Sequence, residues 1–306
     1  MSVPPPGGSS GEDAIELTAT LTSADVDAVR EIVAAAAAAD GVAPLNEPAM
    51  LQVTTADNPR VSHLLVRDDG RLAGYAQLDQ RDPAGPHLEV VVAPQARRQG
   101  FGRALVSRAR TMVAPIPMEL WSHGDQPEAA ALAARLGFDR VRELWLMRRD
   151  LDADLPPIPD PGPVRIRTFR SGADEEAWLK LNARAFADHP EQGQMTRADL
   201  DRRMAQPWFD PKGFFVAERD SRMIGFHWTK VHDGDPPVGE VYVVGIDPAA
   251  QSLGLGKILT LAGLHHLHDR GLATVELYVE AANAPAIALY SRLGFVHTDT
   301  DVMYRG

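Results

Sequence analysis

One motif occurs twice in this chain, and its two copies lie half a chain length apart. Residues 97–102 read Arg-Arg-Gln-Gly-Phe-Gly, and residues 251–257 read Gln-Ser-Leu-Gly-Leu-Gly-Lys, so the copies start 154 residues apart. A second motif, Arg-Leu-Gly-Phe, ends at Phe138 and again at Phe295, 157 residues apart. Two motifs with nearly the same spacing indicate an internal duplication. The 306 residues therefore predict one folding plan used twice, with about half of the chain in each copy.

A proline-rich segment separates the two copies. Residues 155–163 read Leu-Pro-Pro-Ile-Pro-Asp-Pro-Gly-Pro, a composition that excludes a helix or a central strand and suits a stiff linker. We predict a disordered tail at residues 1–12, a first domain at residues 13–150, a linker at residues 151–163 and a second domain at residues 164–306.

The elements predicted in the two halves come in the same order. Each half opens with a capped helix, one after Ser23 and one after a capping box of Ser171 and Asp174. Alternating runs then predict hairpins at residues 61–66 with 71–78 and at residues 213–219 with 223–231. Third strands at residues 87–93 and 240–246 lead directly into the glycine motif, and a helix follows it. This order predicts an α/β fold of the α+β type, with a mixed sheet in each half.

The repeated glycine motif has the properties of an anion site. A strand, a glycine loop and a helix start place free backbone N–H groups and the positive end of the helix dipole around one small volume. A plain tight turn would give the same pattern in a single copy, but duplication in register favours a pyrophosphate site. The motif matches neither a Walker loop nor the Rossmann glycine pattern.

Charge and composition exclude several other functions. The formal net charge of −11 argues against a general nucleic-acid binder, and the absence of cysteine removes disulfides and thiolate chemistry. The first residues lack the features of a signal peptide, and no apolar run is long enough for a bilayer, so a cytoplasmic location without membrane contact is expected. His265, His266 and His268 lack a third ligand at zinc spacing, so no metal is predicted.

These motifs resemble the acetyl-CoA-binding motifs of the GNAT N-acetyltransferases over nearly the whole chain, in two tandem domains. The resemblance implies that the glycine loop holds the CoA pyrophosphate and that pantetheine lies along the preceding strand. It places acetyl-CoA in both halves, up to two molecules per chain. The implied cofactor residues of the second half are Val244, Gly245, Ile246, Gln251, Ser252, Leu253, Gly254, Leu255, Gly256, Lys257, Asn283, Ala284, Pro285, Ala286, Ile287 and Ala288. Those of the first half are Glu89, Val90, Val91, Arg97, Arg98, Gln99, Gly100, Phe101 and Gly102.

Acetyl transfer to an amine needs a base, an oxyanion donor and an acid. Glu240 opens the strand before the second loop and is the candidate base, and the Val244 N–H is the candidate oxyanion donor. Tyr290 is the candidate acid, because a phenol stays protonated at neutral pH. At the motif spacings the first half has Pro86 and Ala133 at the matching positions. We therefore predict that the first half binds the cofactor but is catalytically inactive.

More specific segments resemble a tandem branch of this family that acetylates the cysteinyl α-amine of a cysteine–glucosamine–inositol conjugate. They lie at residues 40–47, 144–151 and 182–193. The resemblance implies substrate contacts at Glu47, Glu191, Lys230, Glu240 and Tyr278.

Three functions remain open at this point. The first is acetylation of that conjugate; the second is acetylation of another small amine, such as an aminoglycoside or polyamine, or of a protein N-terminus. The third is CoA sensing without turnover. In each case a small-molecule ligand, no nucleic acid and a monomeric chain are expected.

Overall fold

The computed structural model describes residues 15–54, 58–82, 85–151, 154–187 and 190–306, except the side chains of residues 190 and 191. The predicted tail at residues 1–12 lies outside the described residues. The chain divides into two units, the first made of residues 1–143 with 300–306 and the second of residues 144–299. The units are thus not two consecutive halves, because the end of the chain belongs to the first unit.

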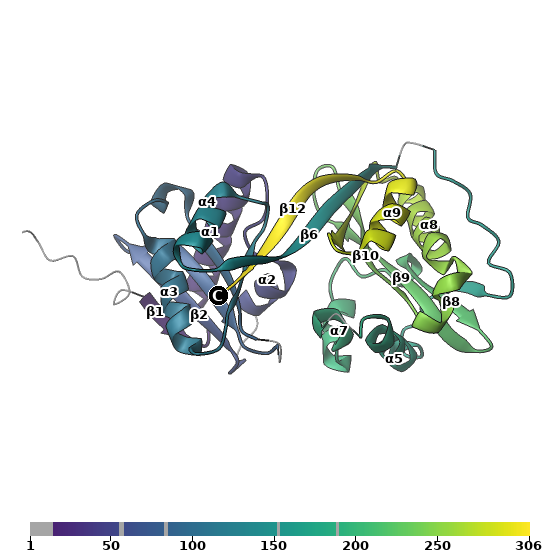
Figure 1. Ribbon diagram of the computed structural model, residues 1–306, viewed down its shortest axis with the longest axis horizontal. Helices are drawn as coiled ribbons and strands as arrows, with labels where there is room; N and C mark the ends of the chain where they lie inside the picture. The colour runs from purple at the N-terminus through teal and green to yellow at the C-terminus, as the bar shows by residue number, and fades with distance from the viewer. Residues whose placement is uncertain (1–14, 55–57, 83–84, 152–153, 188–189) are drawn as a thin grey trace, which may run out of the picture. The chain divides into compact units, whose positions relative to one another are not determined.

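The first unit contains one sheet with helices on both faces (Figure 1). Its strand order is β1-β2-β3-β4-β5, and β5 then pairs with the last residues of β12. Helices α1 and α2 cover one face, and α3 and α4 cover the other. The elements are β1 (Ile15–Thr18), α1 (Ser23–Asp40), α2 (Glu47–Val53), β2 (Val61–Asp68), β3 (Arg71–Asp79), β4 (His87–Val92), a 3-10 turn at Pro94–Ala96, α3 (Phe101–Val113), β5 (Glu119–Ser122) and α4 (Pro127–Arg135).

The second unit repeats this plan, with strand order β6-β11-β10-β9-β8-β7. Helices α5 and α7 cover one face around Trp178 and Trp228, and α8 and α9 cover the other. The elements are β6 (Asp139–Asp150), β7 (Arg165–Thr168), α5 (Glu175–Ala185), α6 (Pro190–Gly193), α7 (Arg197–Met204), a 3-10 turn at Pro211–Gly213, β8 (Phe214–Arg219), β9 (Arg222–His232), β10 (Val238–Ile246), a 3-10 turn at Pro248–Leu253, α8 (Leu255–Asp269), β11 (Thr274–Glu280), α9 (Ala284–Arg292) and β12 (Val296–Arg305).

The final strand of each copy pairs with a strand of the other copy. Residues 144–150 of β6 end the first copy but pair with β11 of the second unit. Residues 302–305 of β12 end the second copy but pair with β5 of the first unit. Each unit therefore completes its sheet with a strand that comes from the other copy of the repeat.

The predicted order of elements is confirmed, while both predicted helix caps are wrong. The N-cap of α1 is Thr22, whose hydroxyl and Asp25 form a reciprocal capping box, and Ser23 is the first helical residue. Asp174 is the N-cap of α5 but makes no capping hydrogen bond. Its carboxylate instead binds the guanidinium groups of Arg167 and Arg170. The described residues of the predicted linker, 151 and 154–163, contain no helix or strand.

Candidate functional site

The sheet of the second unit opens between two parallel strands. Backbone pairing of β10 with β11 covers only Gly239 opposite Val275 and Glu240 opposite Glu276. Within the described part of the chain, residues 241–246 of β10 have no partner strand on that side. A bulge at Tyr242 adds one residue to β10 relative to β9, and bulges bend the strand that carries them. The result is an unpaired strand edge directly before the glycine loop.

The direction of the backbone groups on β10 follows from one hydrogen bond. The N–H of Asp247 donates to the carbonyl of Ile224 in β9, at 2.9 Å. Successive strand residues point their N–H and C=O groups to opposite sides, so Gly245 also faces β9. The groups of Val244 and Ile246 therefore face the opening. Of the three predicted main-chain contacts, two are directed to the opening and Gly245 is not.

The glycine loop ends in a helix start that no side chain caps. Gly254, the N-cap of α8, has φ +69°, a left-handed conformation that favours glycine. The N–H groups of the first turn of α8 have no side-chain acceptor from this cap. A Cβ on Gly256 would lie 3.4 Å from Leu289 of α9, so the glycine permits close packing of the two helices.

A hollow of about 460 Å³ lies at this helix start. It brings together four predicted cofactor residues with the exposed end of α9 and one linker residue. Arg292 adds a second cation beside Lys257; sequence reasoning missed it, although Arg135 repeats it in the first copy of the Arg-Leu-Gly-Phe motif. Free N–H groups, two cations and open space fit a pyrophosphate. The lining residues are Pro156, Gln251, Gly254, Gly256, Lys257, Leu289, Arg292 and Leu293.

The other predicted cofactor residues lie around the same loop. Asn283 caps α9 by accepting a hydrogen bond from the N–H of Ala286, at 3.2 Å. Ser252 and Leu253 are exposed within the 3-10 turn that leads to Gly254, and Leu255 is buried. Ala284, Pro285, Ile287 and Ala288 form the first two turns of α9.

Glu240 lies at the start of the opening in a row of charged side chains. It is 7% exposed, and it lies opposite Lys230 on β9 and Glu276 on β11. Its carboxylate binds the Nε2 of His232 at 2.8 Å. This hydrogen bond raises the pKa of His232 above its ordinary value. Glu276 in turn accepts a hydrogen bond from the Nε of Arg148 on β6, at 3.0 Å.

Tyr290 lies in α9, three residues before Leu293, which lines the hollow. Its ring packs against Phe295, with ring centres 5.8 Å apart in an edge-to-face arrangement. Burial raises the pKa of Tyr290 to about 12, so the phenol keeps its proton at neutral pH. The packing against Phe295 is therefore present, and the role of Tyr290 as a proton donor stays a prediction.

The residues implied as substrate contacts lie in both units. Lys230 is buried beside Glu240, with its ammonium 4.9 Å from the ring centre of Trp208 and 5.4 Å from that of Tyr242. Tyr278 of β11 is 43% exposed. Glu47 is in the first turn of α2, in the first unit. The side chain of Glu191 lies outside what the structure describes.

The first unit has the same opening, but a side-chain bridge crosses it. Pairing of β4 with β5 stops after His87 opposite Glu119 and Leu88 opposite Leu120. Beyond this point Glu89 of β4 binds the Nε2 of His123, the residue after β5, at 2.8 Å. The bridge ties the two strands together just where those of the second unit are apart. Backbone groups of Val90 face the opening, whereas those of Val91 face β3, because the N–H of Ala93 donates to Ala73.

The first glycine loop keeps its geometry but not all of its positive charge. Gly100, the N-cap of α3, has φ +95° and makes no capping hydrogen bond, and Phe101 and Gly102 begin the helix. Arg97 makes two hydrogen bonds of 2.7 Å to the carboxylate of Asp40, which neutralises its charge. Arg98 and Gln99 are exposed, and Arg98 has a φ of +66°.

The bulge in β10 corrects the comparison between the two halves. Glu240 lies opposite Lys230, and the matching pair in the first unit is His87 opposite Asp79, because β4 has no extra residue there. The counterpart of Glu240 is therefore His87 and not Pro86. His87 lies between two carboxylates, with its Nδ1 3.1 Å from Glu119 and its Nε2 3.3 Å from Asp82. The first unit thus has a titratable group at this position.

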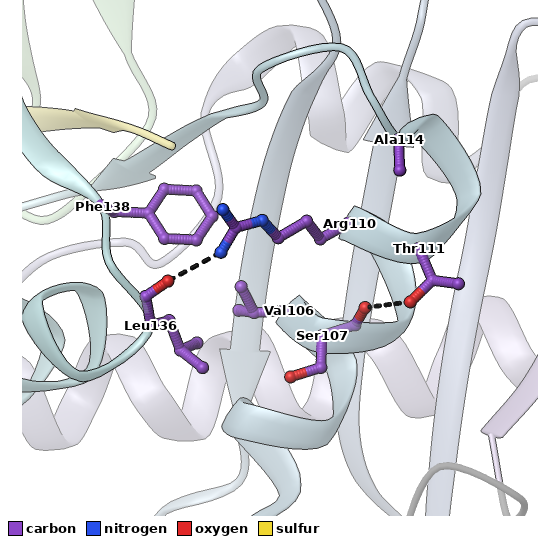
Figure 2. A pocket seen from close by; sticks show the side chains of 7 residues that line it. All are labelled: Val106, Ser107, Arg110, Thr111, Ala114, Leu136 and Phe138. Atoms are coloured by element: carbon purple, nitrogen blue, oxygen red, sulfur yellow. Dashed lines mark hydrogen bonds between the residues drawn. The ribbon is translucent and has the colours of Figure 1, made fainter.

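A second hollow, of about 400 Å³, lies in the first unit (Figure 2). It is bordered by the second half of α3 and by Leu136 and Phe138. Its one charged side chain, Arg110, donates to the carbonyl of Leu136 at 2.7 Å and lies over the ring of Phe138. This hollow contains none of the predicted site residues.

Among the described residues, no group of three or more histidine, aspartate or glutamate side chains is arranged so that it could hold a metal ion. The three histidines of α8 have separate partners: His265 binds the carbonyl of Pro156, His266 faces Asp210, and His268 faces Asp269. Within the same residues, no helix has the length and apolar character needed to cross a bilayer.

Comparison with known families gives one match in each half of the chain. The family described as "Acetyltransferase (GNAT) family" matches residues 176–295. The one described as "Acetyltransferase (GNAT) domain" matches residues 59–140.

Two curated relatives carry the same name and match nearly end to end. A mycothiol acetyltransferase of Catenulispora acidiphila is 54% identical over 92% of this chain and 95% of its own length. One of Thermomonospora curvata is 54% identical over 96% of this chain and 98% of its own.

Two solved structures have the same architecture over almost the whole chain. A GCN5-related N-acetyltransferase from Sphaerobacter thermophilus has a TM-score of 0.71 at 25% identity, covering 96% of both chains. A tandem GNAT protein from the clavulanic acid biosynthesis pathway has a TM-score of 0.74 at 21% identity, covering 95% of this chain and 98% of its own. The predicted tandem fold is thereby confirmed.

Proposed function

We propose that this chain, which belongs to the GNAT acetyltransferases and within them to the mycothiol acetyltransferases, acetylates the cysteinyl α-amine of the cysteine–glucosamine–inositol conjugate desacetylmycothiol. The products are mycothiol and CoA. One observation carries the proposal for the reaction: an open strand edge runs from buried Glu240 to an uncapped helix start. The name shared by the relatives supports the identity of the acceptor.

The donor binds along β10 and at the start of α8. Acetyl-CoA, the donor used by this family, supplies a thioester whose carbonyl is open to attack by an amine. Backbone groups of Val244 and Ile246 hold its pantetheine arm as a further strand would, because both face the opening. N–H groups of the first turn of α8, with Lys257 and Arg292, hold the pyrophosphate.

Glu240 acts as the base. A cysteinyl α-amine has a pKa of about 7.7–8.0, so a nearby carboxylate can accept its proton near neutral pH. The N–H of Val244 points to the opening and stabilises the oxyanion that forms on the attacked carbonyl. Side chains on both sides of Glu240 bind polar parts of the acceptor. Lys230 lies on one side, on β9, and Tyr278 lies on the other side, on β11.

Tyr290 acts as the acid. Its phenol stays protonated well above neutral pH, so it can donate a proton to the departing thiolate of CoA. The first half has alanine at the matching position, Ala133, and its opening is crossed by Glu89 and His123. We infer that only the second half turns over and that the first half holds CoA without transferring acetyl groups. The monomeric state and cytoplasmic location stay predictions from the sequence.

The test is a comparison of acceptors. Purified protein is given acetyl-CoA with desacetylmycothiol, an aminoglycoside, a polyamine or a peptide with a free N-terminus, and CoA release and product mass are measured. We expect kcat/KM for desacetylmycothiol to exceed that for each other amine by about a hundredfold or more. Equal rates for all amines would overturn the acceptor assignment. CoA binding without turnover of any amine would overturn the enzyme assignment.

A further inference from the structure

Arg149 is a buried arginine that makes three hydrogen bonds to backbone carbonyls. It is 7% exposed and lies on β6, opposite Val275 of β11. Its Nη1 donates to the carbonyl of Leu293, its Nη2 to that of Asp154 at 3.1 Å, and its Nε to that of Asp150 at 3.3 Å. One side chain therefore joins the end of β6 and the residues just after it to the end of α9, which lies 144 residues away in sequence.

Two of these segments border the hollow at the glycine loop. Leu293 lines the hollow and ends α9, the helix that also presents Leu289 and Arg292. Asp154 comes two residues before Pro156, which also lines the hollow and whose carbonyl binds His265 at 3.0 Å. Arg149 thus holds two walls of the hollow at fixed positions.

The duplication supplies an internal comparison for this contact. Leu136 in the first unit matches Leu293 at the motif spacing of 157, and its carbonyl also accepts a hydrogen bond from an arginine, Arg110 (Figure 2). The helix ends match as well, since the N–H of Phe138 donates to Ala133 and that of Phe295 donates to Tyr290. The carbonyl after this helix is thus satisfied by an arginine in both copies.

The source and reach of the two arginines differ. Arg110 comes from α3, and its other described contact is the ring of Phe138. Arg149 comes from β6, the final strand of the first copy, and it also binds the carbonyl of Asp154 in the linker. Only the second arrangement connects the helix end to a segment that borders a glycine loop.

We propose that Arg149 is a positioning residue for acetyl-CoA binding in the second unit. It fixes α9 and residues 154–156, which both contribute to the lining of the pyrophosphate hollow, and contacts no reacting atom itself. This inference rests on the function proposed above, because it assigns the hollow to the cofactor. It predicts that loss of Arg149 weakens the binding of acetyl-CoA more than the binding of the acceptor amine.

The test compares Arg149→Met with its matched control Arg110→Met. For Arg149→Met we expect KM for acetyl-CoA to rise about tenfold, as loss of buried charged hydrogen bonds would cause, while KM for the acceptor stays within about twofold. Arg110→Met should leave both KM values unchanged, since its carbonyl borders no predicted site. A merely structural role of Arg149 would reduce the folded fraction, which lowers apparent kcat and leaves KM unchanged. That result would overturn the proposal.

Arg149→Lys covers the case in which the methionine variant does not fold. Lysine keeps the charge but can reach fewer of the three carbonyls, so calorimetry should give a Kd for acetyl-CoA raised about threefold. An unchanged Kd in a folded lysine variant would contradict the role. Calorimetry needs no acceptor amine, so this measurement stays valid if the wild-type protein proves inactive toward desacetylmycothiol. Failure of the proposed function and failure of this inference are therefore distinguishable.

Discussion

Glu240 and His232 share a hydrogen bond of 2.8 Å between neighbouring strands of the second unit. The other charged groups around this imidazole are Glu276, at 3.8 Å, and Lys230, which lies on the same strand two residues away. Because His232 is partly exposed, it connects a buried carboxylate with solvent. A proton taken up by Glu240 could leave by this route during turnover.

The first prediction concerns the charge of this pair. In Glu240→Gln the carboxylate that stabilises the imidazolium is gone, so the pKa of His232 should fall toward its ordinary value. NMR titration of the His232 ring measures this shift. Turnover should drop by about a hundredfold, because the base is lost. Glu276→Gln is the control for the titration, and an equal shift there would contradict the assignment of the main contact to Glu240.

The second prediction concerns the acid. Tyr290→Phe removes the hydroxyl and keeps the packing against Phe295, so kcat should fall by about tenfold to a hundredfold with stability little changed. Since burial raises the pKa of Tyr290 to about 12, the wild-type kcat should not decline through tyrosine ionisation between neutral pH and about pH 10. Full activity of the phenylalanine variant would remove Tyr290 from the mechanism.

The third prediction separates the two glycine loops. Gly254→Ala and Gly100→Ala each force an alanine into a left-handed conformation, at a cost of about 1–2 kcal/mol. Both variants should lose similar stability in chemical denaturation. Only Gly254→Ala should raise KM for acetyl-CoA in the turnover assay, if the second unit alone transfers acetyl groups. A comparable rise in Gly100→Ala would show that the first loop also serves turnover.

The fourth prediction concerns the stability of the first unit. Burial disfavours a charge on His123, but the carboxylates of Glu89 and Asp301 outweigh this effect and raise its pKa to about 10. A histidine whose pKa is raised on folding adds stability that is complete below its ordinary pKa of about 6.5 and is lost as pH rises toward 10.

His123→Gln should therefore lower the free energy of unfolding by about 3–5 kcal/mol near pH 6 and by less near pH 10. Thermal denaturation at several pH values measures the difference from wild type. His268→Gln, at a half-exposed position on α8, is the control for replacement of a histidine outside the first unit. A constant difference across this range would contradict a charged His123.

The tandem fold and the place of the glycine loops could be predicted, because both depend on local signals. The proline and glycine residues at the ends of β4 and β10 determine where each strand stops and each helix begins. The bulge at Tyr242 could not be predicted, because an extra strand residue has no signature apart from its pairing partner. That one residue is the reason that Pro86, and not His87, was matched with Glu240.

Contacts between segments that are distant in sequence could not be predicted either. Asp40 lies 57 residues before Arg97, the arginine that it neutralises, so the sequence alone does not reveal that this charge is balanced. The same limit applies to His123, whose partners Glu89 and Asp301 lie 34 residues before it and 178 residues after it. Arg149 has no motif around it, and its role emerges only from the carbonyls that it reaches.

The exchange of final strands makes the ancient duplication hard to reverse. A gene split at the proline-rich segment would encode a first protein whose β5 has lost its neighbour, residues 302–305, and a second whose β11 has lost residues 144–150. Both would expose an unpaired sheet edge, which favours aggregation. The two copies are thus bound to be inherited and expressed as one polypeptide. That constraint would preserve the first copy whether or not it transfers acetyl groups.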